Sequence, residues 1–242
     1  MNQFDIVYII SLPQSVQRYA KLSSAFDVMG MSYTKFIAIN GYNVTIVNTK
    51  NYQKFKGLDL KNNLVTMDRK TIYEIKCNSD EIDFTLTGRK YNAGEIGLWC
   101  SHFMIWKESA KQEYKKVLVF EDDFLPKNQS TFVKKVNLFL QDLPNSFNVA
   151  YLYAKIQNGV KIALSDDLSH ISKISEGAKW WLAMSYCFSP SFTKKMLANL
   201  HYNASLDGHI TSYSPTLEVY ISTEDLYDVS NSFESSVVSK MG

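Results

Sequence analysis

Short, continuous runs of apolar residues mark the strands that the sequence predicts. The clearest runs are Ile6–Ile10, Val117–Phe120 and Val149–Tyr153, which are rich in β-branched, aromatic and aliphatic side chains. A run without polar alternation is typical of a strand that is covered on both faces. The segments Lys35–Ile39 and Leu182–Phe188 fit the same description less closely. We therefore expect a sheet whose inner strands are formed by these runs.

Between these runs, apolar residues recur at helical spacing. The clearest helix starts near Asn92 and has one apolar face, formed by Ile96, Trp99, Phe103 and Trp106. The segments 16–29, 130–140 and 191–200 show similar spacing. Strands that alternate with helices predict an α/β fold, with a mixed, largely parallel, Rossmann-like sheet and helices on both faces. Ligands of such folds bind beyond the carboxyl ends of the strands.

One stretch, from about Tyr42 to Lys90, departs from this pattern. It is polar, rich in asparagine and lysine, and its apolar pieces are short. With 242 residues, of which 45% are hydrophobic, the chain can bury a sizeable core. We expect a single domain over residues 1–242, with a polar insertion or subdomain at about 42–90.

Three adjacent carboxylates follow the strand predicted at Val117–Phe120. Glu121, Asp122 and Asp123 come where that strand ends, and Pro126 stops the extended run. Repulsion between neighbouring negative charges raises at least one pKa unless a cation or a ring of donors compensates for it. Carboxylate oxygens suit Mg²⁺ and Mn²⁺, which are often held by one or two protein carboxylates together with substrate phosphates. A solvated loop or a helix N-terminal cap is the alternative interpretation of the triplet.

The helix that begins near Asn92 carries two further candidates. Glu95 lies three residues after Asn92, which is the spacing of a capping box, so its role is either structural or chemical. His102 has apolar neighbours three and four residues away, which is as typical of a core histidine as of one in a site. Gly94 and Gly97 lower helix stability, and they indicate the close approach of another backbone or of a ligand.

Charge and composition limit the partners of the chain. With 26 Lys and Arg against 24 Asp and Glu, the net charge is +2, and we expect no nucleic-acid partner. Lysine pairs such as Lys134-Lys135 are typical of solvated helix faces and leave a peripheral membrane contact open. There is no secretion signal and no apolar stretch of bilayer length. We expect a cytoplasmic protein, with peripheral contact at the cytoplasmic membrane face as the alternative, and the oligomeric state stays open.

Several motif classes are missing from the sequence. The three cysteines are widely spaced and form no CxxC pair, which argues against a disulfide framework and against a zinc site. The sequence contains no G-x-S-x-G, H-E-x-x-H, P-loop or G-x-G-x-x-G motif. Reduced, mostly buried thiols are therefore expected, and the acidic triplet remains the leading chemical feature.

The combined pattern of motifs resembles glycosyltransferase family 25, the family of lipooligosaccharide and collagen galactosyltransferases. The resemblance rests on Gly94-Glu-Ile-Gly97, Ser101-His102 and Ile105-Trp106, followed by a strand that ends in Glu-Asp-Asp. It extends over most of residues 5–210 through matches at Ile9-Ile-Ser-Leu12, Arg18, Ala38-Ile-Asn-Gly41, Tyr186-Cys-Phe-Ser189 and Asp207. Asn40 stands where the family pattern has an aspartate.

The resemblance implies a GT-A-like fold, a UDP-sugar donor, a glycan acceptor and transfer with inversion at the anomeric carbon. It assigns a divalent ion, Mn²⁺ or Mg²⁺, to Asp123 and Glu121. The implied donor-binding residues are Ser11, Leu12, Arg18, Asn40, Gly41, Glu121 and Asp122. Catalytic roles are expected for Asp207, the candidate general base, and for His102 and Glu95. An exposed helix position for Arg18 and a turn or capping role for Asp207 are the structural alternatives.

The sequence therefore predicts a metal-dependent inverting glycosyltransferase. The predicted reaction moves a hexose, galactose by family resemblance, from UDP-galactose to a sugar of lipooligosaccharide, lipopolysaccharide or another glycoconjugate. Two alternatives remain open at this point. One is a catalytically degenerate member that binds glycans or partner proteins, and the other is a metal-dependent phosphoesterase that uses the same acidic residues.

Overall fold

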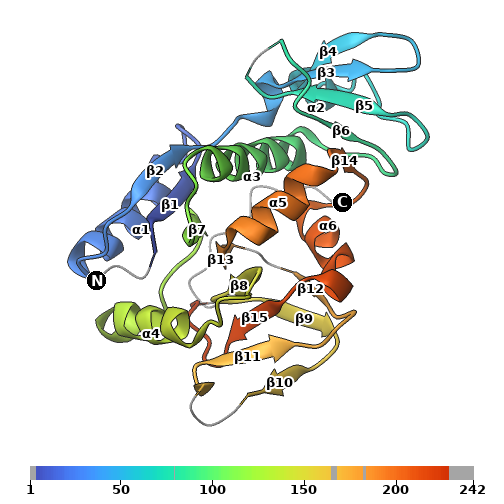
Figure 1. The fold of residues 1–242 in the computed structure, drawn as a ribbon. Helices are drawn as coiled ribbons and strands as arrows, with labels where there is room; N and C mark the ends of the chain where they lie inside the picture. Colours follow the sequence, from blue (N-terminus) through green and yellow to red (C-terminus); the bar gives the residue numbers. More distant parts are fainter. Residues whose placement is uncertain (1–3, 79, 165–167, 182–183, 229–242) are drawn as a thin grey trace.

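The fold consists of two sheets that pack on opposite sides of one long helix, α3 (Ala93–Lys111) (Figure 1). The computed structural model describes residues 4–78, 80–164, 168–181 and 184–228. Within these ranges, no helix is both long and apolar enough to cross a membrane. The three cysteines are buried and form no disulfide.

The main sheet has eight strands in the order β10-β11-β15-β8-β13-β7-β1-β2. Their bounds along the chain are β1 (Ile6–Ser11), β2 (Thr34–Ile37), β7 (Val117–Glu121), β8 (Val149–Tyr151), β10 (Lys161–Ala163), β11 (Ile171–Ile174), β13 (Ser185–Phe188) and β15 (Val219–Ser222). A two-stranded ribbon, formed by β9 (Lys155–Asn158) and β12 (Lys179–Trp181), lies beside it. The mixed α/β architecture is the one that the sequence predicts.

Parallel pairing in the main sheet is less extensive than the sequence predicts. It joins β2 to β1, β1 to β7, and β8 to β15. Strand β13 runs antiparallel between β7 and β8. Parallel neighbours need a long crossover, usually a helix, whereas the chain from β8 to β13 contains the short strands β9 to β12. This run of short strands brings the chain back in the opposite direction.

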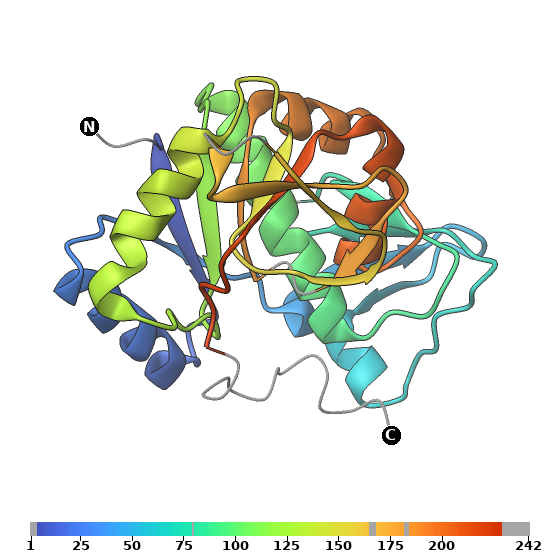
Figure 2. The same cartoon turned by 90° about the horizontal axis from the view of Figure 1, so that it is seen from below.

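Helices cover both faces of the main sheet (Figure 2). On one face, α1 (Val16–Val28) and α4 (Gln129–Asp142) bury Phe26 and Phe132 against β7. On the other face lie α3, α5 (Pro190–Ala198) and α6 (Leu206–Ser212), followed by the short 3-10 helix η3 (Ser214–Thr216). The apolar face predicted for α3 is confirmed, because its four periodic residues are all at most 2% exposed.

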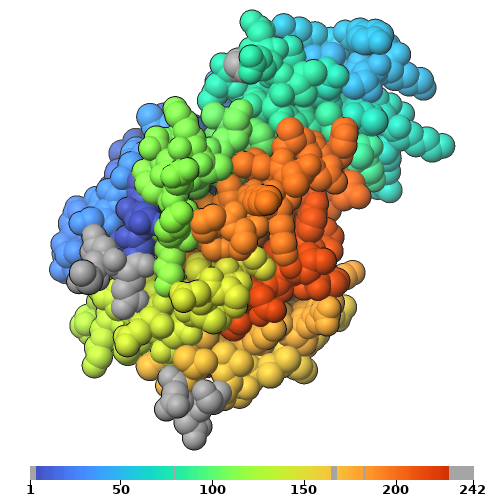
Figure 3. Space-filling view, in the orientation of Figure 1, coloured from blue at the N-terminus to red at the C-terminus, as the bar shows by residue number. Residues whose placement is uncertain are grey.

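The second sheet is built largely from the segment that the sequence marks as polar. Its strand order is β14-β6-β5-β3-β4, with bounds at β3 (Thr45–Asn48), β4 (Lys54–Lys56), β5 (Tyr73–Lys76), β6 (Phe84–Leu86) and β14 (His201–Tyr202). Figure 3 shows it as a lobe at one end of the molecule. Two small helices, η1 (Gly41–Asn43) and α2 (Gly57–Lys61), lie between this sheet and α3.

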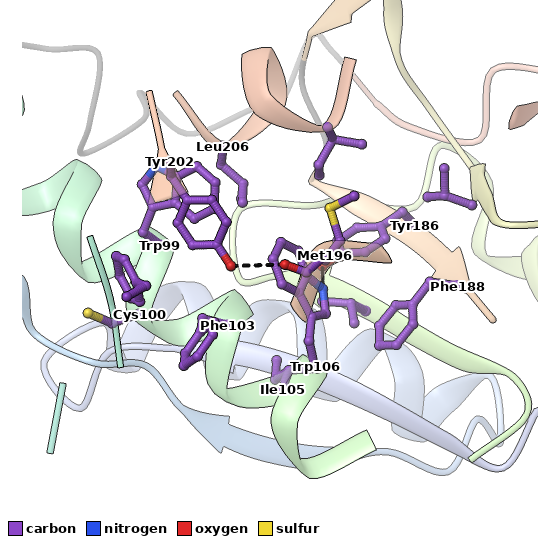
Figure 4. Close-up of a cluster of buried hydrophobic side chains, with 14 of the residues drawn as sticks. Trp99, Cys100, Phe103, Ile105, Trp106, Tyr186, Phe188, Met196, Tyr202 and Leu206 are labelled. Atoms are coloured by element: carbon purple, nitrogen blue, oxygen red, sulfur yellow. Dashed lines mark hydrogen bonds between the residues drawn. The ribbon is translucent and has the colours of Figure 1, made fainter. Parts of the chain in front are cut away.

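Aromatic packing attaches the second sheet to α3. Tyr202 of β14 stacks on Trp99 with ring centroids 4.2 Å apart, and Phe84 of β6 packs against Phe103 at 5.1 Å. Figure 4 shows these α3 side chains in one cluster with residues of β13 and α5. Over the described residues, both sheets and α3 thus share one apolar core.

The predicted strand and helix ends differ from the observed ones by a few residues. Strand β8 stops at Tyr151 instead of Tyr153, β2 covers Thr34–Ile37 instead of 35–39, and α4 is longer than the predicted 130–140. Strand β13 begins at Ser185, while Leu182 and Ala183 of the predicted strand lie outside the described residues.

Three glycines allow the backbone after β2 to lie directly against α3 and α2. A Cβ on Gly41 would stand 1.6 Å from the Ala93 carbonyl oxygen, and one on Gly57 would stand 1.8 Å from the Gly41 carbonyl oxygen. A Cβ on Gly97 would come within 2.6 Å of the Ile39 carbonyl oxygen and the Gly41 nitrogen. The close approach expected at Gly97 is therefore an approach of backbone.

This contact predicts a strong effect of Gly41→Ala. Because the atoms it would strike belong to the backbone, the loops after β2 must shift, and we expect a loss of about 3 kcal/mol or more in the free energy of unfolding. Chemical denaturation followed by circular dichroism measures it. The control is Gly30→Asn, at a glycine with φ +66° and open space around it, where asparagine fits the left-handed backbone. Equal stability losses in the two variants would contradict the packing argument.

Candidate active site

A cavity of about 230 Å³ lies at the carboxyl ends of β1, β2 and β7. These strands are parallel neighbours, so the residues that follow them meet at the same edge of the sheet. The cavity is lined by residues from three segments and from the start of α3: Ile10, Ser11, Leu12, Gln14, Arg18, Ala38, Ile39, Asn40, Gly41, Tyr42, Ala93, Gly94, Gly97, Leu98, Ser101, Glu121, Asp122 and Asp123. All seven predicted donor-binding residues and both predicted metal ligands are among them.

Asp122 has its own cation and its own hydroxyl donor. Ser11 at the end of β1 donates to Asp122 Oδ2 over 2.7 Å, and Arg18 of α1 lies 3.2 Å from Asp122 Oδ1. Burial raises the pKa of Asp122, while Ser11 and Arg18 lower it. The contacts tie the end of β7 to the turn after β1. Asp122 is thus an ion-paired structural carboxylate at the wall of the cavity.

Glu121 and Asp123 carry charge that the protein compensates only in part: the charge of Arg18 lowers the pKa of each, but burial raises it more. Burial raises the pKa of Glu121 to about 8, with further increases from Asp207 and Asp122. Burial, followed by the charge of Glu121, raises the pKa of Asp123 to about 7. Asp123 Oδ1 is buried and has no hydrogen-bond partner among the described residues. Both carboxylates therefore favour a bound cation or proton.

His102 lies directly behind Glu121. Its Nε2 is 3.5 Å from Glu121 Oε1, and its Nδ1 is 2.7 Å from the Tyr186 hydroxyl. The ring is completely buried, and this burial lowers its pKa to about 4, although Asp207 acts in the opposite direction. His102 is therefore neutral at physiological pH. It contacts the site through Glu121 and does not line the cavity itself.

The charge of Asp207, which lies on α6, affects the two residues just described, Glu121 and His102. Its charge is the second influence, after burial, on the pKa of both Glu121 and His102. It is half-buried and lies in the first turn of α6, whose N-cap is Ser205. Ser205 supplies the capping side chain by accepting from the Gly208 N–H, and Asp207 lies in the first helical turn, so its assignment as base or as turn residue stays a prediction. The structure brings Asp207 into the electrostatic environment of the acidic residues.

The loop after β2 is held in place by α3. Ser101 Oγ accepts from the Ile39 N–H at 2.9 Å and donates to the Gly97 carbonyl at 2.8 Å. Asn40 caps η1 by accepting from the Tyr42 N–H. Asn40 and Gly41 thereby lie among the residues that line the cavity, and their donor-binding role stays a prediction.

Glu95 lies apart from the cavity. Its carboxylate accepts from the Asn92 N–H, completing the capping box of α3, and it forms an ion pair with Arg89. It is not among the lining residues. These contacts give Glu95 the structural role of a capping-box residue, which its position three residues after Asn92 indicates. The catalytic role predicted for Glu95 stays a prediction that no contact in the structure supports.

Two residues of the site were not predicted from the sequence. Tyr186 of β13 bonds to His102, and Trp106 Nε1 donates to the Tyr186 hydroxyl over 3.2 Å. Both belong to segments that carry the family resemblance, and this resemblance was the signal in the sequence that could have identified them. The contact between His102 and Tyr186 joins residues 84 apart along the chain, and no local pattern reveals such a pairing.

The carboxylate oxygens at the cavity are suitable ligands for a hard divalent cation. Within the described ranges, no three His, Cys, Asp or Glu side chains are arranged as a metal-binding group. Mg²⁺ and Mn²⁺, however, are commonly bound through one or two carboxylates, with phosphate oxygens and water completing the shell. Glu121 and Asp123 supply such a pair, and the unpartnered Asp123 Oδ1 is a suitable ligand atom.

Fold and site together define an α/β protein with an acidic ligand cavity at the carboxyl edge of its sheet. The profile of glycosyltransferase family 25 (LPS biosynthesis protein) matches residues 4–207. The chain therefore belongs to glycosyltransferase family 25, as its motifs predict.

Relatives within the family differ in the activity that their names state. The rat "Probable inactive glycosyltransferase 25 family member 3" is 26% identical over 199 residues, which is 81% of this chain and 30% of that protein. Mouse "Procollagen galactosyltransferase 2" is 39% identical over 57 residues, or 24% of this chain and 9% of that protein. The chain thus spans about a third or less of the length of these relatives.

A solved structure, that of a mannose-1-phosphate geranyltransferase from Thermus thermophilus, aligns over 54% of this chain and 48% of its own chain, with 13% identity. Its TM-score of 0.29 is too low to bear on the fold.

The raised pKa values predict how stability depends on pH. Glu121 and Asp123 hold protons in the folded state up to about pH 8 and 7, but lose them near pH 4.5 and 3.8 when unfolded. Their stabilising contribution is therefore complete below about pH 4 and is lost as the pH rises to about 8. In metal-free protein, Glu121→Gln and Asp123→Asn should raise the melting temperature at pH 8 relative to wild type, but not at pH 4.

The expected gain at pH 8 is at least about 1 kcal/mol for each variant, or about 2–4 °C in a chain of this size. Thermal unfolding between pH 4 and 8 measures it. The control is Glu218→Gln, because Lys173 lowers the pKa of Glu218 and the substitution should decrease stability at pH 8. Variants of Glu121 and Asp123 that lose stability at pH 8 would show that their charges are already compensated.

Proposed function

We propose that this chain is a metal-dependent inverting glycosyltransferase that transfers a hexose from a UDP-sugar to a glycan. The observation that carries the proposal is a pair of carboxylates at a cavity of a family 25 chain: Asp123 is buried, Glu121 is half-buried, and the pKa of each is raised. A nucleoside diphosphate with its divalent cation supplies the missing charges and fits the carboxyl edge of the sheet.

Each wall of the cavity has a proposed part in holding the donor. Glu121 and Asp123 would hold Mn²⁺ or Mg²⁺, which supplies positive charge to the leaving diphosphate. Arg18 is 18% exposed in its side chain and faces the same space, so its guanidinium can contact a phosphate while it pairs with Asp122. Leu12, Asn40 and Gly41 line the remaining wall and are assigned to the nucleoside.

The proposed transfer needs one base from the chain. The acceptor hydroxyl gives its proton to the Asp207 carboxylate while its oxygen bonds to the anomeric carbon of the sugar. On the opposite face, the bond from that carbon to the diphosphate oxygen breaks, and UDP leaves with the bonding electrons. The configuration at the carbon is therefore inverted. Asp207 suits this role because it is half-buried and its charge acts on Glu121 and His102.

The donor and acceptor are proposed from the family. The local similarity to mouse "Procollagen galactosyltransferase 2" supports galactose as the transferred sugar. The family description, LPS biosynthesis protein, supports a sugar of lipopolysaccharide, lipooligosaccharide or another glycoconjugate as the acceptor. The proposal includes the cytoplasmic location that the sequence predicts.

A catalytically degenerate family member is the second candidate. It is favoured by the names of the relatives that match over 199 residues, among them the human "Inactive glycosyltransferase 25 family member 3", which is 25% identical. Such a protein would keep the fold and bind a glycan or a partner protein without turnover. Asn40 is the residue by which this chain departs from the family motif at the cavity.

A donor panel distinguishes these functions. The protein is incubated with Mn²⁺ and a series of UDP-sugars, and sugar release and UDP formation are followed by mass spectrometry. Slow release from UDP-galactose that becomes faster when a glycan acceptor is added is the expected result. Binding of glycan without turnover of any donor would support the degenerate member. Phosphate release from simple esters without use of UDP-sugars would identify a phosphoesterase.

The metal assignment predicts the effect of Asp123→Asn. We expect turnover to fall by at least about 100-fold, because stabilisation of the leaving diphosphate is lost. The melting temperature without metal should not decrease at pH 7.5. Mn²⁺ together with UDP should stabilise the wild type and not the variant. The matched control is Asp80→Asn, which removes a fully exposed carboxylate and should leave turnover unchanged. Full activity of Asp123→Asn would remove Asp123 from the metal site.

A further inference from the structure

A chain of buried hydrogen-bonding groups runs from α3 through β13 to the acidic residues. Trp106, Tyr186 and His102 are all completely buried. Trp106 Nε1 lies 3.2 Å from the Tyr186 hydroxyl, and that hydroxyl lies 2.7 Å from His102 Nδ1. On its other side, His102 Nε2 lies 3.5 Å from Glu121 Oε1, which is an electrostatic contact and not a hydrogen bond within the described residues. The apolar core around α3 encloses the chain from Trp106 to Tyr186 (Figure 4).

The chemistry of Trp106 sets the direction of this chain. An indole N–H can only donate, so the Tyr186 oxygen is an acceptor in the first bond. The Tyr186 proton then needs an acceptor of its own, because an unpaired buried hydroxyl proton is costly. His102 Nδ1 is the acceptor that the described residues provide at hydrogen-bond distance.

A histidine that accepts at Nδ1 carries its proton at Nε2 in the neutral ring. The opposite tautomer would give the Tyr186 oxygen two donors and leave its own proton without a partner. When Glu121 is ionised, that tautomer would also place the Nε2 lone pair against a negatively charged oxygen. Both consequences disfavour that tautomer, so the buried donor at Trp106 controls whether the ring nitrogen beside Glu121 carries a proton.

We propose that Trp106 and Tyr186 are positioning residues that hold His102 as the Nε2–H tautomer, so that His102 orients Glu121 toward the cavity. The inference rests on the proposed function, because it gives Glu121 its ligand role. Nothing in this chain of contacts touches the substrate. Its effect is to fix one carboxylate whose other oxygen then faces the ligand, in the way that outer partners orient the ligands of metal sites.

The tautomer of His102 can be tested without catalysis or metal. In protein with ¹⁵N-labelled histidine, long-range ¹H–¹⁵N spectra distinguish Nε2–H from Nδ1–H, and the loss of one signal set in His102→Asn assigns it among the four histidines. Wild type should show His102 as Nε2–H. Tyr186→Phe removes the donor to Nδ1, and the ring should no longer hold a single tautomer. A wild-type ring protonated at Nδ1 would overturn the inference, whatever the variants do.

The consequence for Glu121 is tested by metal binding. Mn²⁺ affinity in the presence of UDP, measured by electron paramagnetic resonance, should weaken about 10-fold to 100-fold in Tyr186→Phe. Trp106→Phe should change tautomer and affinity in the same direction, and it provides a second variant should Tyr186→Phe fold poorly. Unchanged tautomer and unchanged Mn²⁺ affinity in a folded Tyr186→Phe protein would refute the positioning role.

The matched control is Tyr202→Phe. Tyr202 is also fully buried in the core around α3, and its hydroxyl donates to the Met196 carbonyl over 3.1 Å (Figure 4). This variant loses a comparable buried hydrogen bond but should keep the His102 tautomer and the Mn²⁺ affinity of wild type. A wild-type protein that binds neither UDP nor Mn²⁺ would refute the proposed function, while the tautomer measurement would still decide the direction of the chain.

Discussion

Burial of negative charge at the end of β7 is the constraint on which the site depends. Of the three adjacent carboxylates, Asp122 obtains a guanidinium from Arg18 and a hydroxyl from Ser11, which partly offset the rise in pKa that burial causes. Asp123 is buried and Glu121 is half-buried beside it, and burial raises the pKa of both despite the charge of Arg18. Carboxylates kept in a form that costs stability are typical of functional sites. The alternative of a solvated acidic loop is thereby excluded for this triplet.

Helix α3 sets the distance between the two walls of the cavity. Near its start, Gly97 lets the backbone after β2 approach closely, and Ser101 bonds to the Ile39 N–H of the same loop. One residue further along, His102 meets Glu121 at the end of β7. Within two turns, the helix thus contacts both the loop after β2, where the nucleoside is proposed to bind, and the acidic residues at the end of β7. Its aromatic face, which includes Trp99, also attaches the second sheet.

Features that depend on neighbouring residues along the chain were predicted from the sequence, whereas features that depend on contacts between distant segments were not. Continuous apolar runs identified β1, β7 and β8, and spacing identified the capped start of α3, because these signals are local. The strands of the second sheet escaped notice, since short strands such as Tyr73–Lys76 bury alternate residues only and read as polar. The antiparallel β13, the Asp122 to Ser11 bond and the His102 to Tyr186 bond join distant segments, and composition or periodicity cannot reveal such partners.

The buried charges also bear on whether this chain has lost its ligand. A member that no longer binds a cation or a phosphate gains stability from any substitution that neutralises Glu121 or Asp123, because each carboxylate is desolvated in the folded state. Nothing in the fold alone requires either acid, since Asp122 already ties β7 to β1 and α1. Their presence together, with His102 directed at one of them, favours retained binding of a cation and phosphates. In the proposed reaction, turnover would then depend on Asp207, whose charge acts on Glu121 from α6.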